Sequence, residues 1–429
     1  MNVLANHQSA AGPARHAPSP GWITASLALC MLLPALGTSI ANVALPTLAS
    51  DFSAPFRQVQ WVVLAYLLAN TASIVSVGRL GDIVGRKRLL IAGVALFTAA
   101  SGLCGLAPRL DLLIAARAAQ GLGAAAMMAL GLAFVGEAVP KSHAGRAMGM
   151  LGAMSATGTA LGPTLGGLLI ARFGWPSIFL VMLPLGVLAL ALVLAQRCLP
   201  RDRAASKAAQ PRFDVIGSLR RDPALLRGLA MSALVSTVVM ATLVVGPFYL
   251  VRALGLDAAK VGIAMSVGPA IAALTGVPAG RAVDRLGAQR MTVIGLGGMV
   301  AGCLALSLAP AVLCVAGYVL PLAIVTGSYA LFQTANNTAV MAGAAPDRRG
   351  VLAGMLNLSR NLGLICGAAA MGAVFAFAAG TDDIATASPD AVAIGMRVTF
   401  GVAAVLVIAA LAIAAGSPAR ARTAAPARA

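Results

Sequence analysis

One charged phrase occurs twice in this chain, and each copy lies between two long apolar stretches. The phrase reads Gly-Arg-x-x-Asp-x-x-Gly-x-x-Arg, and its copies begin at Gly78 and Gly280. The match extends past the phrase, because residues 78–108 and 280–310 share ten identities without a gap. A charged segment repeated at matched places in an apolar chain indicates two homologous halves inside a membrane.

The composition requires that lipid surrounds most of the chain. Hydrophobic residues make up 59% of the 429 residues and charged residues 10%, against about 45–50% and about 25% in soluble domains. A helix needs about 20 apolar residues to cross the hydrocarbon layer. Twelve stretches meet this criterion, at about residues 22–47, 60–78, 89–107, 111–137, 147–170, 175–196, 227–250, 260–279, 291–309, 312–335, 350–379 and 392–415. We therefore expect an all-α integral membrane protein whose twelve transmembrane helices form two pseudo-symmetric six-helix bundles.

A charged break in the middle of the chain divides these helices six and six. Residues 197–227 hold eight basic and three acidic residues and no apolar run of membrane length. The sequence thus predicts five parts, namely a disordered cytoplasmic N-terminus at 1–21, an N-terminal bundle at 22–196, a cytoplasmic linker at 197–226, a C-terminal bundle at 227–415 and a disordered cytoplasmic tail at 416–429.

The position of the basic residues explains the net charge of +18. The helix plan places 23 of the 31 lysines and arginines on one side of the membrane, five on the other side and three within spans. An excess of lysine and arginine marks the cytoplasmic side of a membrane protein. We therefore expect a multi-pass protein of the cytoplasmic (inner) membrane with both termini in the cytoplasm. The asymmetry favours this interpretation over a nucleic-acid-binding surface, so no nucleic-acid partner is expected.

Several kinds of chemistry find no support in the sequence. No pair of the six cysteines has Cys-x-x-Cys spacing and all three histidines lie outside the spans, so we expect no metal site and no histidine relay in the membrane. No lysine follows a glycine, which excludes the phosphate-binding loop of pumps that hydrolyse ATP. Nucleophile-elbow and zinc-protease signatures are missing too. We expect neither a cofactor nor an enzymatic activity.

The charged phrase itself points to a family. The segment from Gly78 to Arg88 resembles the signature of the major facilitator superfamily between its second and third helices, and the copy at Gly280 strengthens the match. In that family the aspartate packs against a helix end of the opposite half and latches the cytoplasmic side, so the resemblance assigns this role to Asp82. A positive helix N-terminus would favour the aspartate. One departure is Ile83, where a basic residue is usual.

The expected gating residues come from both copies of the phrase. They are Gly78, Arg79, Asp82, Gly85, Arg86 and Arg88 in the first copy and Gly280, Arg281, Asp284, Arg285 and Arg290 in the second. The plainer alternative is a tight turn with basic anchors on the cytoplasmic side.

Two further stretches resemble the drug:proton antiporter branch of this family. They are residues 39–47, at the end of the first span, and residues 175–186, at the start of the sixth. Many members of that branch have fourteen helices, but the linker has no room for two more. The acidic residue common five positions before Asn42 is Gly37 here. Because a carboxylate inside the membrane is the obvious proton carrier, this departure removes the simplest route for proton coupling.

The fourth span carries an arginine inside the membrane. Arg117 and Gln120 lie in a segment that resembles the family's helix-4 motif, whose arginine and glutamine face the central cavity. Their spacing places both side chains on one helical face. An arginine at mid-helix costs a few kcal/mol on insertion scales, so Arg117 should face a cavity or a partner. The alternative is that it extends to the outer interface, since it lies only about 9 Å along the helix.

The fifth span is rich in glycine around one Gly-Pro pair. The pattern predicts a bent helix with a bare groove for close packing, and it resembles an antiporter motif that correlates with export. Close packing without a directional meaning is the alternative. The residues of this motif are Gly158, Gly162, Pro163, Gly166 and Gly167.

Polar residues in three other spans are candidates for the translocation pathway. In the eleventh span Asn357 and Asn361 share a face, and Arg360 lies about 15 Å into the span, near the bilayer midplane. The other candidates are Gln333, Asn336 and Asn337 in the tenth span and Thr38 and Asn42 in the first. For each, the alternative is a hydrogen bond between helices, worth about 0.6 kcal/mol on average.

Together these features predict a secondary transporter that works by alternating access. The resemblance implies efflux of a small drug-like or metabolite compound, with proton exchange as the energy source. The arginines favour an anionic or neutral ligand. Two alternatives remain open, an importer or facilitator of a small anionic or neutral solute and a transport-dead membrane sensor with this fold. The expected partners are a small-molecule substrate, protons and membrane lipids, and the protein is expected to be a monomer.

Overall fold

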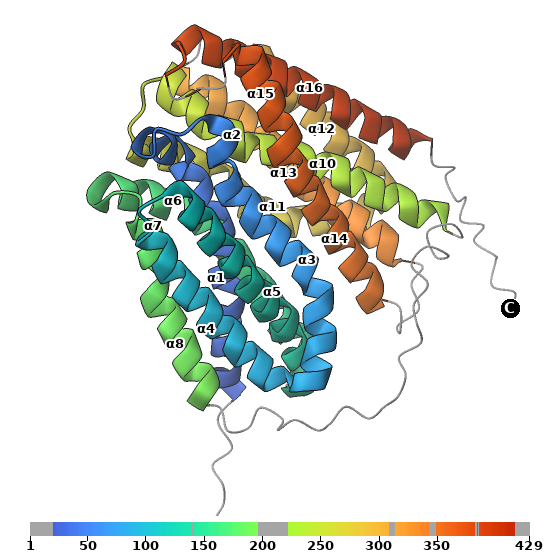
Figure 1. Cartoon of the computed structure of the whole chain (residues 1–429). Coiled ribbons are helices and arrows are strands. Elements are labelled where there is room, and N and C mark those ends of the chain that lie inside the picture. Colours follow the sequence, from blue (N-terminus) through green and yellow to red (C-terminus); the bar gives the residue numbers. More distant parts are fainter. Residues whose placement is uncertain are drawn as a thin grey trace, which may run out of the picture.

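A computed structural model describes residues 20–138, 141–195, 222–308, 314–342, 349–381, 384 and 386–416. Every regular element within these ranges is a helix (Figure 1). The predicted disordered ends and most of the predicted linker lie outside the described residues.

The part of the chain before the linker, called the N-terminal half, contains six long helical segments. In two of them a short helix leads directly into a longer one. The helices are α1 (Pro20–Asp51), α2 (Phe56–Val59), α3 (Trp61–Val84), α4 (Arg86–Gly105), α5 (Leu110–Ala138), α6 (Lys141–Phe173), α7 (Ser177–Leu180) and α8 (Met182–Ala195).

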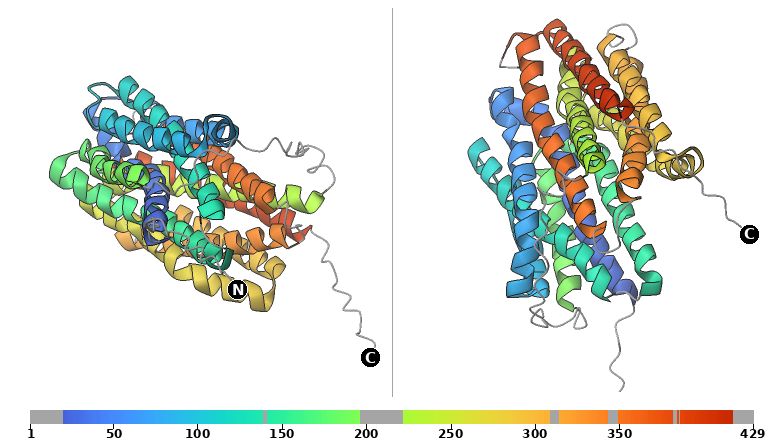
Figure 2. Two further views of the ribbon diagram at one scale, coloured as in Figure 1. Left: turned by 90° about the horizontal axis from the view of Figure 1, so that it is seen from below. Right: turned by 90° about the vertical axis from the view of Figure 1, so that its right-hand side faces the viewer.

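The part after the linker, called the C-terminal half, contains six further segments, two of which include a π-helical turn. The helices are α10 (Pro223–Phe248) with the π-turn η1 (Tyr249–Ala253), α11 (Ala258–Leu286), α12 (Ala288–Leu308), α13 (Cys314–Met341), α14 (Arg349–Cys366) with the π-turn η2 (Gly367–Met371) and α15 (Gly372–Ala379), and α16 (Pro389–Ala415). Figures 1 and 2 show the two halves side by side.

These twelve segments coincide with the twelve predicted spans. Within the described ranges, ten helices are long and apolar enough to cross a membrane. The other two segments contain α3 and α6, which have 24 and 33 residues and are therefore also long enough to cross. The predicted all-α architecture of twelve helical segments is confirmed.

The repeated phrase forms the same joint in both halves. A single glycine separates α3 from α4, and a single glycine separates α11 from α12. These glycines are Gly85, with φ 103°, and Gly287, with φ 88°, a backbone region that residues with a Cβ rarely adopt. The predicted spans 60–78 and 89–107 leave residues 79–88 between helices, and this part of the prediction is wrong. Most of the phrase continues the two helices, and one glycine makes the break.

Bare glycines explain how closely α6 approaches α1. A Cβ added at Gly158, Gly162 or Gly166 would collide with α1. Ser39 Oγ of α1 also donates a 3.2 Å hydrogen bond to the carbonyl oxygen of Gly158. α6 runs through Pro163 as one helix. Small residues permit such close contacts in a membrane, where no hydrophobic force drives helices together.

The two halves touch at one end of the molecule, which we call the closed end. Here α6 crosses α11 at Gly167 and Gly262, and a Cβ at Gly167 would lie 2.8 Å from Gly262 Cα. The rings of Phe56, Phe248 and Phe375 form a cluster whose centroids are 4.8, 5.6 and 6.5 Å apart. Phe56 belongs to the N-terminal half and the other two rings to the C-terminal half.

A hydrogen bond joins the halves beside this cluster. Gln60 Nε2, at the start of α3, donates a 2.7 Å hydrogen bond to the carbonyl oxygen of Ala368 in η2. The contacts of the closed end lie near the starts of α3 and α11, whereas the repeated phrase lies at the ends of the same helices. The closed end is therefore the end away from the phrase.

Candidate functional site

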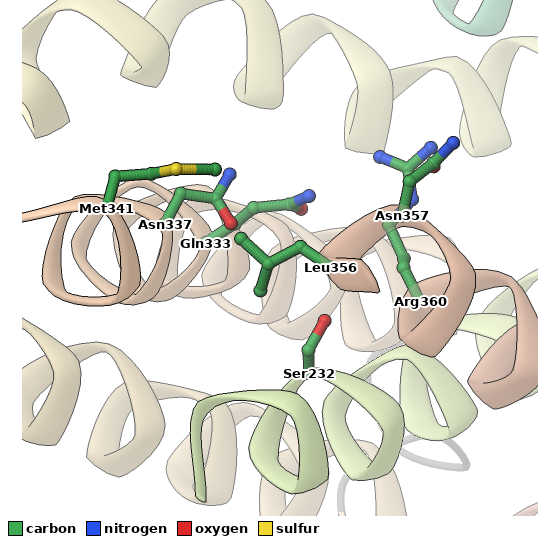
Figure 3. A pocket seen from close by; sticks show the side chains of 7 residues that line it. All are labelled: Ser232, Gln333, Asn337, Met341, Leu356, Asn357 and Arg360. Carbon is green, nitrogen blue, oxygen red and sulfur yellow. The ribbon is translucent and has the colours of Figure 1, made fainter. Parts of the chain in front are cut away.

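A cavity lies inside the C-terminal half between α10, α13 and α14 (Figure 3). Its empty volume is about 470 Å³, including the space at its mouth. The side chains that line it are Ser232 from α10, Gln333, Asn337 and Met341 from α13, and Leu356, Asn357 and Arg360 from α14. Polar groups thus face one space from three helices.

The polar side chains of this cavity are not paired with other described residues of the protein. Among the described residues, no side-chain hydrogen bond or ion pair is formed by Ser232, Gln333, Asn337, Asn357 or Arg360. Most polar side chains in protein interiors are hydrogen-bonded to protein or to ordered water. Ser232 is buried and Gln333, Asn357 and Arg360 are half-buried, whereas Asn337 is exposed. Partly enclosed polar side chains without a protein partner around one space are typical of a site that receives a ligand or water.

Polar neighbours on the same helices are paired. Asn336 Nδ2 on α13 donates a 3.1 Å hydrogen bond to the carbonyl oxygen of Gly228 on α10. Ser359 Oγ on α14 donates a 2.6 Å hydrogen bond to the carbonyl oxygen of Leu229 on α10. These bonds tie the three helices together around the cavity. Backbone carbonyls of α10 thus accept hydrogen bonds from polar side chains beside the cavity. Among the described residues, the polar side chains that line the cavity have no such partner.

Arg360 is the one charged side chain among the described residues that line this cavity. It is half-buried, and its Nε atom is enclosed without a hydrogen-bond partner. Leaving a buried polar atom unpaired costs about 1–3 kcal/mol, and more when the group is charged. The guanidinium group can therefore donate hydrogen bonds to an acceptor on a ligand.

The structure brings four of the predicted pathway residues together, namely Gln333, Asn337, Asn357 and Arg360. Asn336 and Asn361 are buried, with 2% and 7% exposure, and neither lines the cavity. Sequence reasoning missed Ser232, Met341 and Leu356. A lone serine or an apolar residue in an apolar helix carries no functional signal, so only the packing of the three helices identifies these three.

A second group of predicted residues lies inside the N-terminal half. Arg117 is fully buried. Its Nε donates a 2.9 Å hydrogen bond to the carbonyl oxygen of Val62, and its Nη1 donates to Gln120 Oε1. Its Cζ atom lies 4.2 Å from the centre of the Tyr66 ring, which is close enough for a cation–π interaction. Gln120 in turn donates a 2.7 Å hydrogen bond to Ser101 Oγ. Arg117 is enclosed by the protein and does not extend to the membrane surface.

This network contains no carboxylate among the described residues, and Arg117 Nη2 has no partner. Gly37 of α1 borders the network. A Cβ at Gly37 would lie 3.8 Å from Met182 Sδ, and the same sulfur accepts a 3.6 Å hydrogen bond from Gln120 Nε2. The position at which the resemblance expects an acid is therefore next to the arginine network, and this chain has glycine there.

Thr38 and Asn42 lie one turn apart on α1, beside the same network. Thr38 Oγ1 and the Tyr66 hydroxyl both donate 2.9 Å hydrogen bonds to the carbonyl oxygen of Pro34. Asn42 Nδ2 donates a 3.0 Å hydrogen bond to the carbonyl oxygen of Thr38, whereas its Oδ1 is buried without a partner. Neither residue lines the C-terminal cavity.

The gating residues are described only in part. In the second copy Arg281, Asp284, Arg285 and Arg290 are exposed, and Gly280 is half-buried. In the first copy Arg86 is half-buried and Arg88 is exposed. The side chains of Gly78, Arg79 and Asp82 lie outside the described residues, so the latch expected of Asp82 stays a prediction. No group of three or more metal-ligating side chains occurs in the described ranges.

Sequence comparison relates the chain to known transporters. The sequence model of the Major Facilitator Superfamily matches residues 27–368. The chain is 29% identical to the riboflavin transporter RibZ of Clostridioides difficile (strain 630) over 83% of this chain and 88% of that protein. It is 30% identical to the uncharacterized transporter YebQ of Escherichia coli (strain K12) over 78% of this chain and 84% of that protein. The multidrug resistance protein Stp of Mycobacterium tuberculosis is 43% identical over 46% of this chain and 36% of that protein.

Solved structures show the same fold. A bacterial homologue of the human lysosomal transporter Spinster, in an inward-facing and occupied conformation, matches with a TM-score of 0.77 at 17% identity, over 92% of this chain and 96% of that chain. A D-xylose–proton symporter matches with a TM-score of 0.74 at 17% identity, over 92% and 97% of the two chains. The chain therefore belongs to the Major Facilitator Superfamily and is a multi-pass membrane transporter of small solutes.

Proposed function

We propose that this protein exports a small organic compound by alternating access and that the compound binds in the cavity around Arg360. The observation that carries the proposal is the set of five polar side chains that line this cavity without a partner in the part of the chain that the structure describes. Export is supported by similarity to the multidrug resistance protein Stp and to the methylenomycin A resistance protein of Streptomyces coelicolor. Similarity to the riboflavin transporter RibZ keeps import of a metabolite as the second candidate.

The charge distribution supports a direction for the cycle. Basic residues predict that the repeated phrase and both termini face the cytoplasm. The closed end then faces outward. In this proposal the compound enters the cavity from the cytoplasm, and a rearrangement of the two halves about the closed end releases it outside.

Exchange for protons is the energy source that the resemblance to drug:proton antiporters suggests. Against it stands the absence of a carboxylate from the C-terminal cavity and from the Arg117 network, within the residues that the structure describes. Measuring the internal pH of proteoliposomes during substrate flux tests this part separately. Substrate flux that leaves the pH unchanged removes proton exchange and leaves export standing.

Purified protein in proteoliposomes tests the proposal. The first probes are riboflavin and methylenomycin A, the compounds named for two relatives. For a transported probe, Asn337→Ala and Asn357→Ala should each lower flux about tenfold, which corresponds to the loss of one hydrogen bond of about 1.4 kcal/mol. Leu358→Ala is the matched control, because Leu358 is exposed on the same helix beside Asn357.

Two outcomes would count against the proposal. Wild-type flux in both asparagine variants would place the substrate outside this cavity. A compound that stabilises the protein against heat but is never moved would favour the sensor alternative.

A further inference from the structure

We infer that the C-terminal cavity takes an organic anion, and that a carboxylate or similar planar anionic group of the substrate pairs with Arg360. The inference rests on the proposed function and names the chemical class of its substrate. It depends on how the protein uses its buried arginines and on what else faces the cavity.

Two arginines within the described spans, Arg117 and Arg360, are used in different ways. Arg117 is held by the protein, because it donates to Val62 and Gln120 and stacks on Tyr66. Arg360 makes no hydrogen bond or ion pair to any residue that the structure describes, and its Nε is enclosed. No packing or pairing role within the protein therefore accounts for the Arg360 guanidinium, which faces the cavity.

A carboxylate supplies what this guanidinium lacks. Arginine is always charged, and its donors form a planar fork that matches two carboxylate oxygens. Among the described residues, no acidic side chain lines the cavity to provide these oxygens. A lipophilic cation would meet a like charge in a partly enclosed space and would find no carboxylate to receive it. The cavity thus selects against the cation and for the anion.

The remaining wall describes the rest of the substrate. Gln333 and Asn337 lie one turn apart on α13, and Asn357 faces the same space from α14 (Figure 3). Each carboxamide offers both donors and an acceptor, so together they suit the polar edge of a ring system. Leu356 and Met341 supply an apolar surface. An aromatic or polycyclic carboxylate with further oxygen or nitrogen atoms fits this combination.

The test compares charged and neutral ligands of the same shape. A set of aromatic carboxylates with one to three fused rings, each paired with its primary carboxamide, is screened against the purified full chain by thermal shift and calorimetry. We expect at least one carboxylate to bind tenfold or more tightly than its carboxamide. Arg360→Gln should abolish this preference and Arg360→Lys should retain part of it. Arg397→Gln should leave it unchanged, because Arg397 is an exposed arginine on α16.

Three results would overturn the inference. One is a set in which every carboxamide binds as tightly as its carboxylate, the second is a preference that survives Arg360→Gln, and the third is a set in which no carboxylate binds. If Arg360→Gln fails to fold, the ratio of the two affinities in the wild-type protein decides alone. If neutral compounds are transported and Asn357→Ala blocks their transport, the proposed function stands and the inference of an anionic substrate is wrong. Flux that no cavity variant alters would remove the proposed function itself.

Discussion

The side-chain amide of Gln60 donates a 2.7 Å hydrogen bond to the carbonyl oxygen of Ala368, a residue 308 positions further along the chain. Gln60 is 5% exposed, and Ala368 belongs to the π-turn η2. The bond joins the two halves of the protein beside the cluster of three phenylalanine rings.

Replacement of Gln60 by alanine should loosen the closed end. The change removes a buried hydrogen bond, whose net contribution to stability is about 0.5–1.5 kcal/mol. We expect a lower melting temperature for Gln60→Ala in detergent, whereas Gln58→Ala, an exposed neighbour on α2, should melt like the wild type. Equal melting temperatures for the two variants would contradict the role of this bond.

Gly372 provides an independent check on the same contact. A Cβ at Gly372 would collide with the Gln60 amide, so Gly372→Ala should displace it and weaken the same hydrogen bond. The two changes should therefore not be additive. Adding Gly372→Ala to Gln60→Ala should cost less than adding it to the wild type.

The crossing of α6 and α11 should not tolerate a methyl group. A Cβ at Gly262 would lie 2.5 Å from the Pro163 carbonyl oxygen, and overpacking of this kind costs about 1–3 kcal/mol. Gly262→Ala should therefore weaken the contacts of the closed end. A cysteine placed at the buried Val59 (Val59→Cys), in a variant without exposed cysteines, should then be labelled faster. Gly276→Ala is the control on the same helix, because a Cβ there meets no atom within 4 Å. Identical labelling rates would show that the crossing can open without cost.

Replacement of Arg117 by lysine should destabilise the protein. A lysine ammonium group cannot reach the Val62 carbonyl, the Gln120 side chain and the Tyr66 ring with the planar geometry of a guanidinium group. Each lost charge-assisted hydrogen bond costs about 1.5–3 kcal/mol. Arg117→Lys should therefore lower the melting temperature strongly, whereas the exposed Arg397→Lys should not. A small effect in both variants would mean that the network contributes little to stability.

The repeated joints should respond alike to a methyl group. Alanine at Gly85 or Gly287 would be forced into a backbone region that costs about 1–3 kcal/mol for a residue with a Cβ. Gly85→Ala and Gly287→Ala should both lower stability. Gly280→Ala should not, because Gly280 lies within α11 with open space around its Cα and alanine favours a helix by about 1 kcal/mol. A neutral Gly287→Ala would remove the strain argument.

The helices were predictable because length and hydropathy decide them. The span predicted at 392–415 is α16, Pro389–Ala415, since a membrane leaves the backbone no alternative to a helix. The joint at Gly85 was predictable as a break but not in its extent. Ile83 and Val84 continue α3 to the glycine, and charged residues near a helix end do not by themselves make a loop.

The sequence predicts the cavity only at residues that are costly inside a membrane span. Arg360 stands out because a charge deep in a span requires a partner or a cavity. Asn336 and Asn337 could not be separated by sequence, because neighbouring residues lie about 100° apart on a helix and either could face the cavity. In the structure Asn336 bonds to α10 and Asn337 lines the cavity. The choice depends on the rotation of α13 within the bundle, which hydropathy does not determine.

In the proposed cycle, an empty cavity would leave the guanidinium group of Arg360 without a counter-ion while the two halves rearrange around it. Enclosing an unpaired charge is costly, whereas a bound anion neutralises it. The loaded protein should therefore change state faster than the empty one. Preloading proteoliposomes with unlabelled substrate is expected to raise the initial uptake of labelled substrate several-fold, and Arg360→Gln should reduce this acceleration. Equal wild-type rates with and without preloading would contradict the expectation. If the expectation holds, the positive charge that binds the substrate also slows the return of the empty transporter. The rate of net transport then depends on how much of a second anion is present on the far side of the membrane.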